Sequence, residues 1–228
     1  MSTASTRGLQ GVRLIRSRIV FEKNSTTRTP ARPAVQRRGI ERRRALLDAA
    51  EALLEEKGYE AATLKAIGER AGVPIASVYH YFSDRHRVEA EILQRHAHEL
   101  DALIGAALDE PAPRTLRDAA DAVIDPLLGY FRRHPSCTEL WFSGRGATVG
   151  ELVRAFDEAQ AERLWRLLVE RELVLPDTPR RVLRLAFEVG NRLFDIAFRN
   201  SAAGDDATID EARRLITAYL QTYAAGGA

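Results

Sequence analysis

The sequence predicts an all-α protein with a small head of three helices, a long connecting helix and a larger helical body. Three observations indicate this fold class. Apolar residues recur at spacings of three and four along every strongly patterned segment after residue 38, as on one face of an α-helix. Gly and Pro residues mark where those patterns stop. No segment shows the alternation of apolar and polar residues that is typical of a strand.

The composition limits the class of protein. The chain has 228 residues, of which 45% are hydrophobic, so it is long enough to bury one large or two modest cores. Cys137 is the single Cys, so a disulfide within the chain is excluded, and we interpret it as a small buried apolar side chain. No apolar run approaches the roughly 20 residues that span a bilayer. With no signal-peptide pattern either, we expect a cytoplasmic protein with no membrane partner.

Charge is distributed unevenly along the chain. Residues 1–44 hold twelve of the 34 Lys and Arg and two of the 32 acidic residues, which leaves 22 basic and 30 acidic residues for the remainder. A basic end on an acidic body is typical of a protein that contacts a polyanion with one end only. Residues 1–38 lack periodicity and predict a disordered basic arm. The arm is either a tether along phosphates or a minor groove, or a solvated tail.

The first helix of the head is predicted by an apolar stripe that stops at Lys57-Gly58. Gly58 suits the position just after a helix, and Lys57 suits the negative end of the helix dipole. The residues of the stripe are Leu46, Leu47, Ala50, Leu53 and Leu54.

Residues 63–82 have the layout of two short helices joined by a tight turn. Thr63 is a good N-cap for the first helix, Gly72 tolerates the positive φ of a tight turn, and Pro74 suits the first position of the second helix. The inward-facing residues would be Leu64, Ile67, Ala71, Val73 and Val78. This is the layout of a helix-turn-helix, which places its second helix in the major groove of DNA. We therefore assign residues 39–84 to a DNA-binding domain.

The outer face of that second helix is compact. Its leading residues are Pro74, Ile75, Ala76 and Ser77. None of them is a long hydrogen-bonding side chain, so we expect contact with thymine methyl groups and readout of groove shape more than of hydrogen-bonding patterns. Tyr79, His80 and Tyr81 have polar tips and are placed where the DNA backbone would run.

The rest of the chain predicts a helical body. Ser83 or Asp84 caps a long helix that runs to about Leu108, and Pro111 and Pro113 end it. Further helices are expected at about 115–133, 137–142, 149–172, 179–199 and 208–224. The helix over 179–199 is apolar around more of its circumference than one intramolecular face needs. This surplus favours a homodimer through helices 179–199 and 208–224.

Residues 43–88 resemble the DNA-binding domain of the tetracycline-repressor (TetR) family. The resemblance rests on Arg44-Ala45-Leu46-Leu47-Asp48-Ala49-Ala50, Leu54, Lys57-Gly58-Tyr59, Ala62-Thr63-Leu64, Ile67-Gly68, Arg70-Ala71-Gly72-Val73, Ser77-Val78-Tyr79 and Tyr81-Phe82-Ser83-Asp84-Arg85. It implies a ligand-responsive transcriptional regulator, usually a repressor, that binds a pseudo-palindromic double-stranded operator as a homodimer. A small-molecule effector would bind the domain of residues 85–228 and release the protein from DNA by favouring another spacing of the two heads.

The resemblance also implies a set of DNA-contacting residues. They are Arg44, Thr63, Pro74, Ile75, Ala76, Ser77, Tyr79, His80 and Arg85. Thr63 and Arg85 would donate to phosphates, residues 74–77 would face base edges, and residues 79–80 would contact the backbone. The family usually has Ser or Thr where this chain has Pro74, so a hydroxyl and an N–H are missing there. Thr63 could instead act only as a helix cap, and Tyr79 and Phe82 as wedges between the head and the connecting helix.

The sequence predicts the effector site less specifically than it predicts the DNA-binding head. The candidates are polar or aromatic residues within apolar helices, namely Trp141, Phe142, Phe156, Gln160, Trp165, Glu188, Asn191 and Asp195. The alternative for each is a core, surface or interface residue, and Arg192 and Asp195 could pair across a dimer.

No catalytic, cofactor or metal site is predicted. Residues 142–146 contain a Gly-x-Gly that follows no strand and lacks the remaining glycine of a nucleotide-binding fingerprint. His96 and His98 are two residues apart on a helix and point in different directions, so they are a poor metal pair. Cys137 and His134 match no nucleophile motif. The alternative function is a sequence-nonspecific architectural protein that binds nucleic acid through the basic arm.

Overall fold

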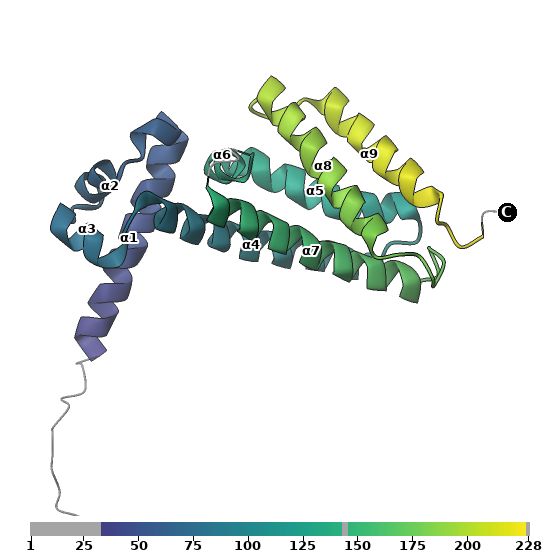
Figure 1. Cartoon of the computed structure of the whole chain (residues 1–228), viewed down its shortest axis with the longest axis horizontal. Helices are drawn as coiled ribbons and strands as arrows, with labels where there is room; N and C mark the ends of the chain where they lie inside the picture. The colour runs from purple at the N-terminus through teal and green to yellow at the C-terminus, as the bar shows by residue number, and fades with distance from the viewer. Residues whose placement is uncertain (1–32, 143–145, 227–228) are drawn as a thin grey trace, which may run out of the picture.

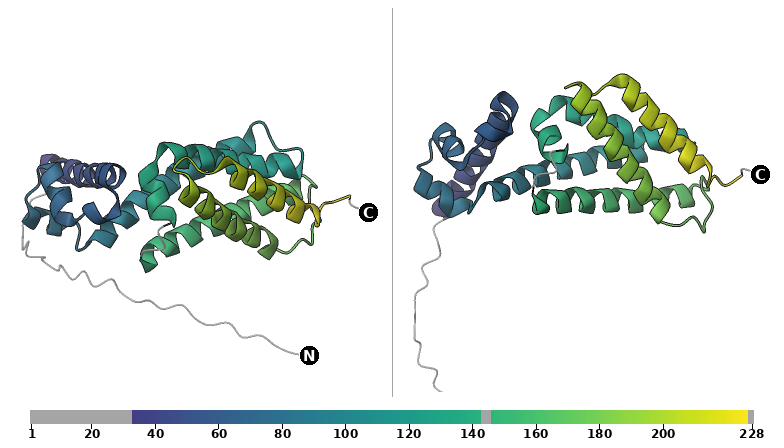
Figure 2. Two further views of the ribbon diagram at one scale, coloured as in Figure 1. Left: turned by 90° about the horizontal axis from the view of Figure 1, so that it is seen from above. Right: turned by 45° about the horizontal axis from the view of Figure 1, so that its top comes forward.

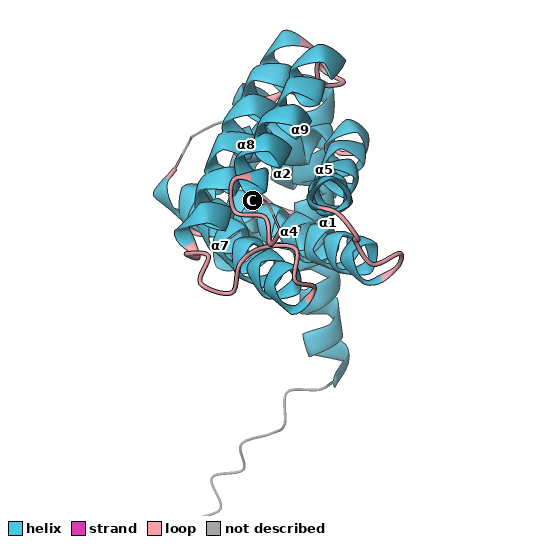
Figure 3. Cartoon of the chain, turned by 90° about the vertical axis from the view of Figure 1, so that its right-hand side faces the viewer, coloured by secondary structure: helices cyan, strands magenta, loops and turns pink. Residues whose placement is uncertain are grey.

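The computed structural model describes residues 33–142 and 146–226, and within these ranges the chain is built from helices (Figure 3). The predicted all-α class is confirmed for this part of the chain. Residues 1–32 of the predicted arm lie outside the described residues. The arm's boundary at residue 38 is wrong, because the first helix is already formed at residue 33. Residues 33–38 contain no breaker after Pro33, and an ion pair between Arg37 and Glu41, 3.2 Å apart, lies along one face of the helix.

The head is a small three-helix unit with one 3₁₀ turn (Figure 1). Its elements are α1 (Pro33–Lys57), η1 (Tyr59–Ala61), α2 (Leu64–Ala71) and α3 (Ile75–Tyr81). Leu46 of α1, Ile67 of α2 and Val78 of α3 are each at most 1% exposed and form the centre of the head. The predicted stripe of α1 and the predicted inward residues of α2 and α3 therefore meet as expected.

The connecting helix α4 (Arg85–Asp109) extends from the head into the body (Figures 1 and 2). Its 25 residues give a length of about 37 Å. Asp84 caps it, because the Asp84 carboxylate accepts the Arg87 N–H at 3.0 Å. The first turns of α4 pack against α1, and its remaining length lies beside α5 and α7 of the body.

The body consists of five further helices, and the predicted ranges agree with them within a few residues. They are α5 (Leu116–Arg133), α6 (Pro135–Phe142), α7 (Ala147–Glu170), α8 (Arg181–Asn200) and α9 (Asp206–Gln221). Two side-chain caps set the starting points of body helices. Thr115 caps α5 with a reciprocal capping box, and Asp205 caps α9, which begins two residues earlier than predicted. Helix α6 begins at Pro135, directly after His134 ends α5.

Helices α8 and α9 lie side by side on the outer surface of the body (Figures 1 and 2). The segment after α9 is fastened to the loop after α7, since the Leu175 N–H donates to the Tyr223 carbonyl at 3.1 Å and the Ala225 N–H to the Leu173 carbonyl at 3.2 Å. None of the helices in the described ranges is both long enough and apolar enough to cross a bilayer.

Candidate nucleic-acid interface

Two glycines allow α2 and α3 to cross closely. Gly72 lies in the left-handed region with φ 66° and ψ 28°, as predicted for the turn. The close approach of α3 to Gly68 was not predicted from the sequence. A Cβ on Gly68 would lie 2.8 Å from Val78 Cγ2 and 2.9 Å from the Val73 carbonyl oxygen. The only sequence signal was a glycine in a helix interior, which costs about 1 kcal/mol relative to Ala and so suggests a close approach.

Most of the predicted DNA-contacting residues of α3 are exposed to solvent on its outer face. Ile75 is 42% exposed and Tyr79 is 58% exposed, and they lie one turn apart on the same face. Pro74, Ala76 and His80 are also exposed, and Ser77 is half-buried. The wedge interpretation is therefore wrong for Tyr79.

Phe82 is buried, as expected for a wedge, and it contacts α1. Its side chain is 1% exposed, and the Arg43 guanidinium lies 5.1 Å from the centre of its ring. Phe82 therefore fixes the end of α3 against α1.

Pro74 precedes α3 rather than opening it. Its ψ of 139° is not helical, and its carbonyl oxygen accepts the N–H groups of Ser77 at 2.8 Å and Val78 at 3.1 Å. The predicted position is therefore wrong by one residue, because Pro74 is the N-cap and Ile75 the first helical residue. The missing hydroxyl and N–H leave Ile75 and Ala76 as the leading exposed groups of this edge.

Thr63 and Arg44 have side chains that remain accessible. The Thr63 hydroxyl oxygen accepts the Ala66 N–H at 3.2 Å, so the predicted N-cap is confirmed. The hydroxyl hydrogen is not used by that bond, so capping and donation to a phosphate are compatible. The Arg44 side chain is 80% exposed and lies 3.8 Å from Asp48.

Arg85 is engaged within the protein. Its guanidinium lies 3.5 Å from the centre of the Tyr59 ring and donates to the Tyr59 carbonyl. Its Nε lies 2.7 Å from the carboxylate of Glu89, which is buried. Arg85 thus fastens the start of α4 to η1, and a contact with phosphate requires the side chain to leave these partners.

Ion pairs join α1 to the connecting helix. Arg95 of α4 lies 2.8 Å from Asp48 and also pairs with Glu51. The Nε of Arg43 on α1 donates to Glu91 of α4 at 3.0 Å. These contacts fasten α1 of the head to the first turns of α4.

The body contains a small apolar cavity of about 50 Å³ among α5, α7, α8 and α9. It is lined by Ala120, Val123, Ile124, Leu127, Leu164, Ala186, Phe187, Gly190, Asn191, Phe194, Ile216 and Leu220. Of the predicted effector residues, only Asn191 lines it. Ligand pockets usually measure about 300–1,000 Å³, so a drug-sized effector requires this cavity to widen.

The predicted aromatic effector residues lie in the core or are covered. Trp141 and Phe156 are buried and meet edge to face, with ring centres 5.1 Å apart. Phe142 stacks on Phe198 at 6.1 Å. The Trp165 Nε1 donates to the Thr178 carbonyl at 2.8 Å. These contacts are the kind that core aromatic side chains make. The buried Trp141 Nε1, however, has no hydrogen-bond partner among the described residues.

The predicted polar effector residues point to different places. Gln160 is 2% exposed and donates to Asp101 at 2.7 Å. Glu188 is exposed. Asp195 pairs with Arg192 and Arg199 of its own helix, so the predicted Arg192–Asp195 pair forms within this chain. These side chains do not converge on one pocket, because polar residues in amphipathic helices can be satisfied on several faces.

Asp157 is a buried acid that the sequence analysis missed. It is 8% exposed and accepts the Asn191 amide at 2.5 Å. Burial, reinforced by the nearby Glu188 carboxylate, raises the pKa of Asp157 from 3.8 to about 8. The acid therefore holds its proton at neutral pH in the folded protein.

We expect Asp157 to make the free energy of unfolding fall as the pH rises from about 4 to about 8. In this window the native state keeps a proton that the unfolded chain has lost, so the native state binds more protons. The slope is at most about 1.4 kcal/mol per pH unit. Asp157→Asn should flatten it and should be the more stable protein at about pH 8.5. Urea unfolding of both proteins across this pH range is the measurement, and parallel curves would contradict the expectation.

Comparisons with known proteins match both parts of the chain. The family described as "Bacterial regulatory proteins, tetR family" matches residues 46–87. The family described as "Tetracyclin repressor-like, C-terminal domain" matches residues 115–220. The first match covers the helix-turn-helix and the start of α4, and the second covers α5 to α9.

Two individual proteins resemble the chain over most of its length, and a third resembles a shorter part of it. A crystal structure of a TetR-family transcriptional regulator from Streptomyces coelicolor is 34% identical, covers 80% of this chain and 99% of its own, and superposes with a TM-score of 0.61. The HTH-type transcriptional regulator BetI of Cronobacter sakazakii is 24% identical over 82% of this chain and 93% of its own. The HTH-type transcriptional repressor KstR of Mycolicibacterium smegmatis is 37% identical over 27% of this chain and 30% of its own.

Proposed function

The chain belongs to the TetR family of transcriptional regulators, and from this premise we propose that it binds a pseudo-palindromic DNA operator as a homodimer and is released by a small molecule. The family consists of DNA-binding transcription factors rather than enzymes. The observation that carries the proposal is the exposed edge of α3. Ile75 and Tyr79 are exposed to solvent there, on a tightly packed α2–α3 unit.

The edge of α3 suits a major groove. Its leading residues, Ile75 and Ala76, are compact and apolar, so they would contact thymine methyl groups. Tyr79 and His80 follow one turn later and would meet the sugar–phosphate backbone, while Thr63 and Arg44 would donate to phosphates from α2 and α1. Arg85 would join them on DNA by exchanging the Tyr59 carbonyl for a phosphate oxygen. We propose that the DNA-binding unit spans residues 33–84 and the effector and dimerisation unit residues 85–228.

The outer face of α8 and α9 suits a second copy of the chain. Leu185 is 51% exposed, Val189 39% and Leu215 47%, and a groove of about 390 Å³ lies among them. Large apolar side chains gathered on one face mark an interaction surface. Because the proposed operator has two half-sites, an isologous dimer through this face would present one head to each.

The effector would act through the cavity among α5, α7, α8 and α9. Helix α4 packs along α5 and α7, and its first turns are joined to α1 by ion pairs, so widening the cavity would shift α4 and change the separation of the heads. An effector that prefers the wider state lowers operator affinity by shifting the population of conformations. Repression is the proposed outcome, supported by the resemblance of part of the chain to a transcriptional repressor.

Selection of genomic DNA fragments by the purified chain tests this function. Sheared DNA from the organism that carries the gene is incubated with the protein, and the bound fragments are sequenced. We expect a small set of fragments that share one palindrome. An architectural protein acting through its basic arm would instead recover fragments in proportion to their abundance, with a steep dependence on salt. That result would exclude the regulator.

A further inference from the structure

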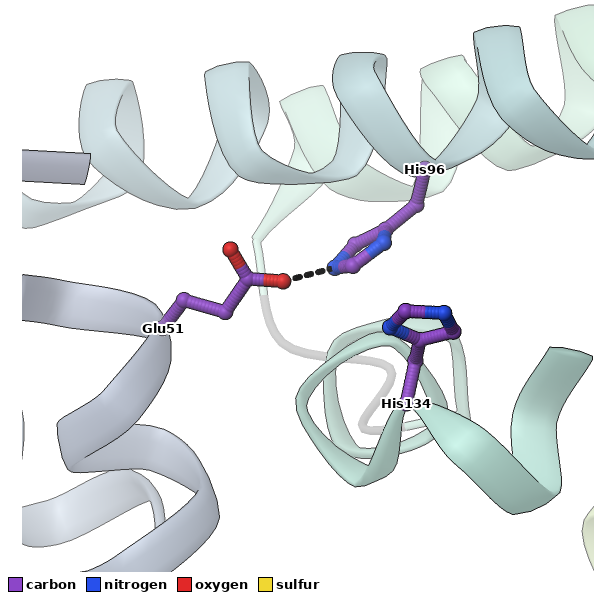
Figure 4. Close-up of side chains that lie close together, drawn as sticks. All are labelled: Glu51, His96 and His134. Atoms are coloured by element: carbon purple, nitrogen blue, oxygen red, sulfur yellow. Dashed lines mark ion pairs between the residues drawn. The ribbon is translucent and has the colours of Figure 1, made fainter. Parts of the chain in front are cut away.

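Three side chains converge where the head meets the body (Figure 4). Glu51 comes from α1, His96 from α4, and His134 from the corner between α5 and α6. Each offers one ligand atom, and these atoms all lie within 4.8 Å of one another. The sequence analysis missed this cluster, because its members are separated by 45 and 38 positions in the numbering. We propose that Glu51, His96 and His134 bind a divalent transition-metal ion, tested as zinc.

The hydrogen bonds around His96 orient its free nitrogen. The Tyr130 hydroxyl donates its single hydrogen to Glu99 at 2.7 Å, so its oxygen is left to accept from His96 Nδ1, 2.8 Å away. The proton of a neutral His96 ring therefore sits on Nδ1, an assignment that follows from the network. The Nε2 lone pair then faces the Glu51 carboxylate oxygen, 3.1 Å away.

Two acceptors that face each other at this distance need a proton or a metal ion between them. His96 is 3% exposed, and its Nε2 has no hydrogen-bond partner among the described residues. A metal ion satisfies both groups, and the Tyr130 contact on the far nitrogen is the kind of outer-shell support that metal-bound histidines have. Arg95 holds the other oxygen of Glu51 and so directs the first toward His96.

The set of donors suits zinc. Two imidazoles and one carboxylate, with a water as fourth ligand, form a known zinc arrangement, and its ligand atoms lie about 3.4 Å apart. Glu51 and His134 are half-buried, so small side-chain rotations bring them to that separation. A surface depression of about 540 Å³, lined by Glu51, His96 and His134 among others, gives the ion and the water a path in.

Charge around the cluster is close to balanced. The depression is lined by the acidic side chains Asp48, Glu51 and Glu99 and by Arg43, Arg44 and Arg95. Arg43 pairs with Glu91, and Arg95 pairs with Asp48 and Glu51, so the attraction for a cation comes from the three ligands themselves. An ion held by all three ligands joins α1, α4 and the α5–α6 corner directly.

Zinc binding by the untagged full-length chain is the first test. The protein is stripped with a chelator, dialysed and titrated with zinc chloride in a calorimeter. We expect about one zinc per chain. Glu51→Gln and His134→Gln should each lower the affinity by at least about 10- to 100-fold, the loss that even an outer-shell change causes. His98→Gln is the matched control, because His98 is an exposed histidine on α4, the helix that carries His96. This variant should bind zinc with the affinity of the original chain.

Three results would overturn the metal site. The first is absence of zinc binding by the original chain. The second is zinc affinity in Glu51→Gln and His134→Gln equal to that of the original chain. The third is loss of zinc binding in His98→Gln. Thermal unfolding of each variant without metal checks that it is folded, and zinc should raise the melting temperature of the original chain and of His98→Gln only.

A second measurement tests the effect on DNA and rests on the proposed function. A zinc ion that joins head and body should change operator affinity by about tenfold in the original chain and leave His134→Gln unaffected. Equal affinity with and without zinc would overturn regulation by the ion. Failure to select any operator would overturn the proposed function, whereas the calorimetric result for the metal site would stand.

Discussion

Ile75→Arg is expected to abolish selective operator binding while the protein stays folded and dimeric. Ile75 is 42% exposed at the start of α3, so the longer side chain meets no core residue. In the groove, however, the compact apolar contact is replaced by a long charged donor that matches no thymine methyl. The loss should be about 1–3 kcal/mol in each half-site, which is roughly 30-fold or more for the dimer.

A gel-shift titration with operator and with unrelated DNA measures this loss. The added positive charge favours DNA of any sequence, so the ratio of the two affinities is the informative quantity. Leu103→Arg is the matched control, because Leu103 is 40% exposed but lies on α4 within the body. An unchanged ratio in Ile75→Arg, or an equal loss in Leu103→Arg, would remove α3 from the interface.

Leu185→Glu is expected to convert the dimer into a monomer. Leu185 is 51% exposed on α8 and borders the groove between α8 and α9. In an isologous dimer the substitution places two like charges in one apolar interface, which costs several kcal/mol. Because one head alone lacks the second half-site, operator affinity should fall by about 100-fold or more.

Sedimentation velocity at micromolar concentration measures the oligomeric state of Leu185→Glu. Leu175→Glu is the matched control, since Leu175 is 46% exposed but lies in the loop between α7 and α8. It should remain a dimer and bind the operator normally. A dimeric Leu185→Glu protein would place the dimer interface elsewhere.

The helices of this chain could be predicted because their signals are local. Thr63 and Thr115 cap the helices that follow them, and Gly72 adopts the turn conformation that its sequence context suggested. These residues act within one helical turn, so a short stretch of sequence contains the whole interaction. The errors at the later helix ends, such as the N-cap position of Pro74, amount to a few residues, whereas α1 already begins at residue 33 within the predicted arm.

The parts that could not be predicted depend on contacts distant in the sequence. Gly68 matters because Val78 approaches it from the next helix. Asp157 has an unusual pKa because α7 and α8 bury it together. The effector candidates were chosen by residue type along single helices, which gives no information on whether their side chains meet. Of these candidates, only Asn191 lines the cavity, and its amide donates a hydrogen bond to Asp157.

The length of α4 has a geometric consequence for how little the body needs to move. A helix of about 37 Å acts as a lever, and a tilt of about 5° at one end displaces the other by about 3 Å. That displacement is close to the spacing of successive nucleotides along one strand, about 3.4 Å. In the proposed release by an effector, widening of the 50 Å³ cavity would therefore need to tilt α4 by only a few degrees to cause a mismatch of about one base step at the groove.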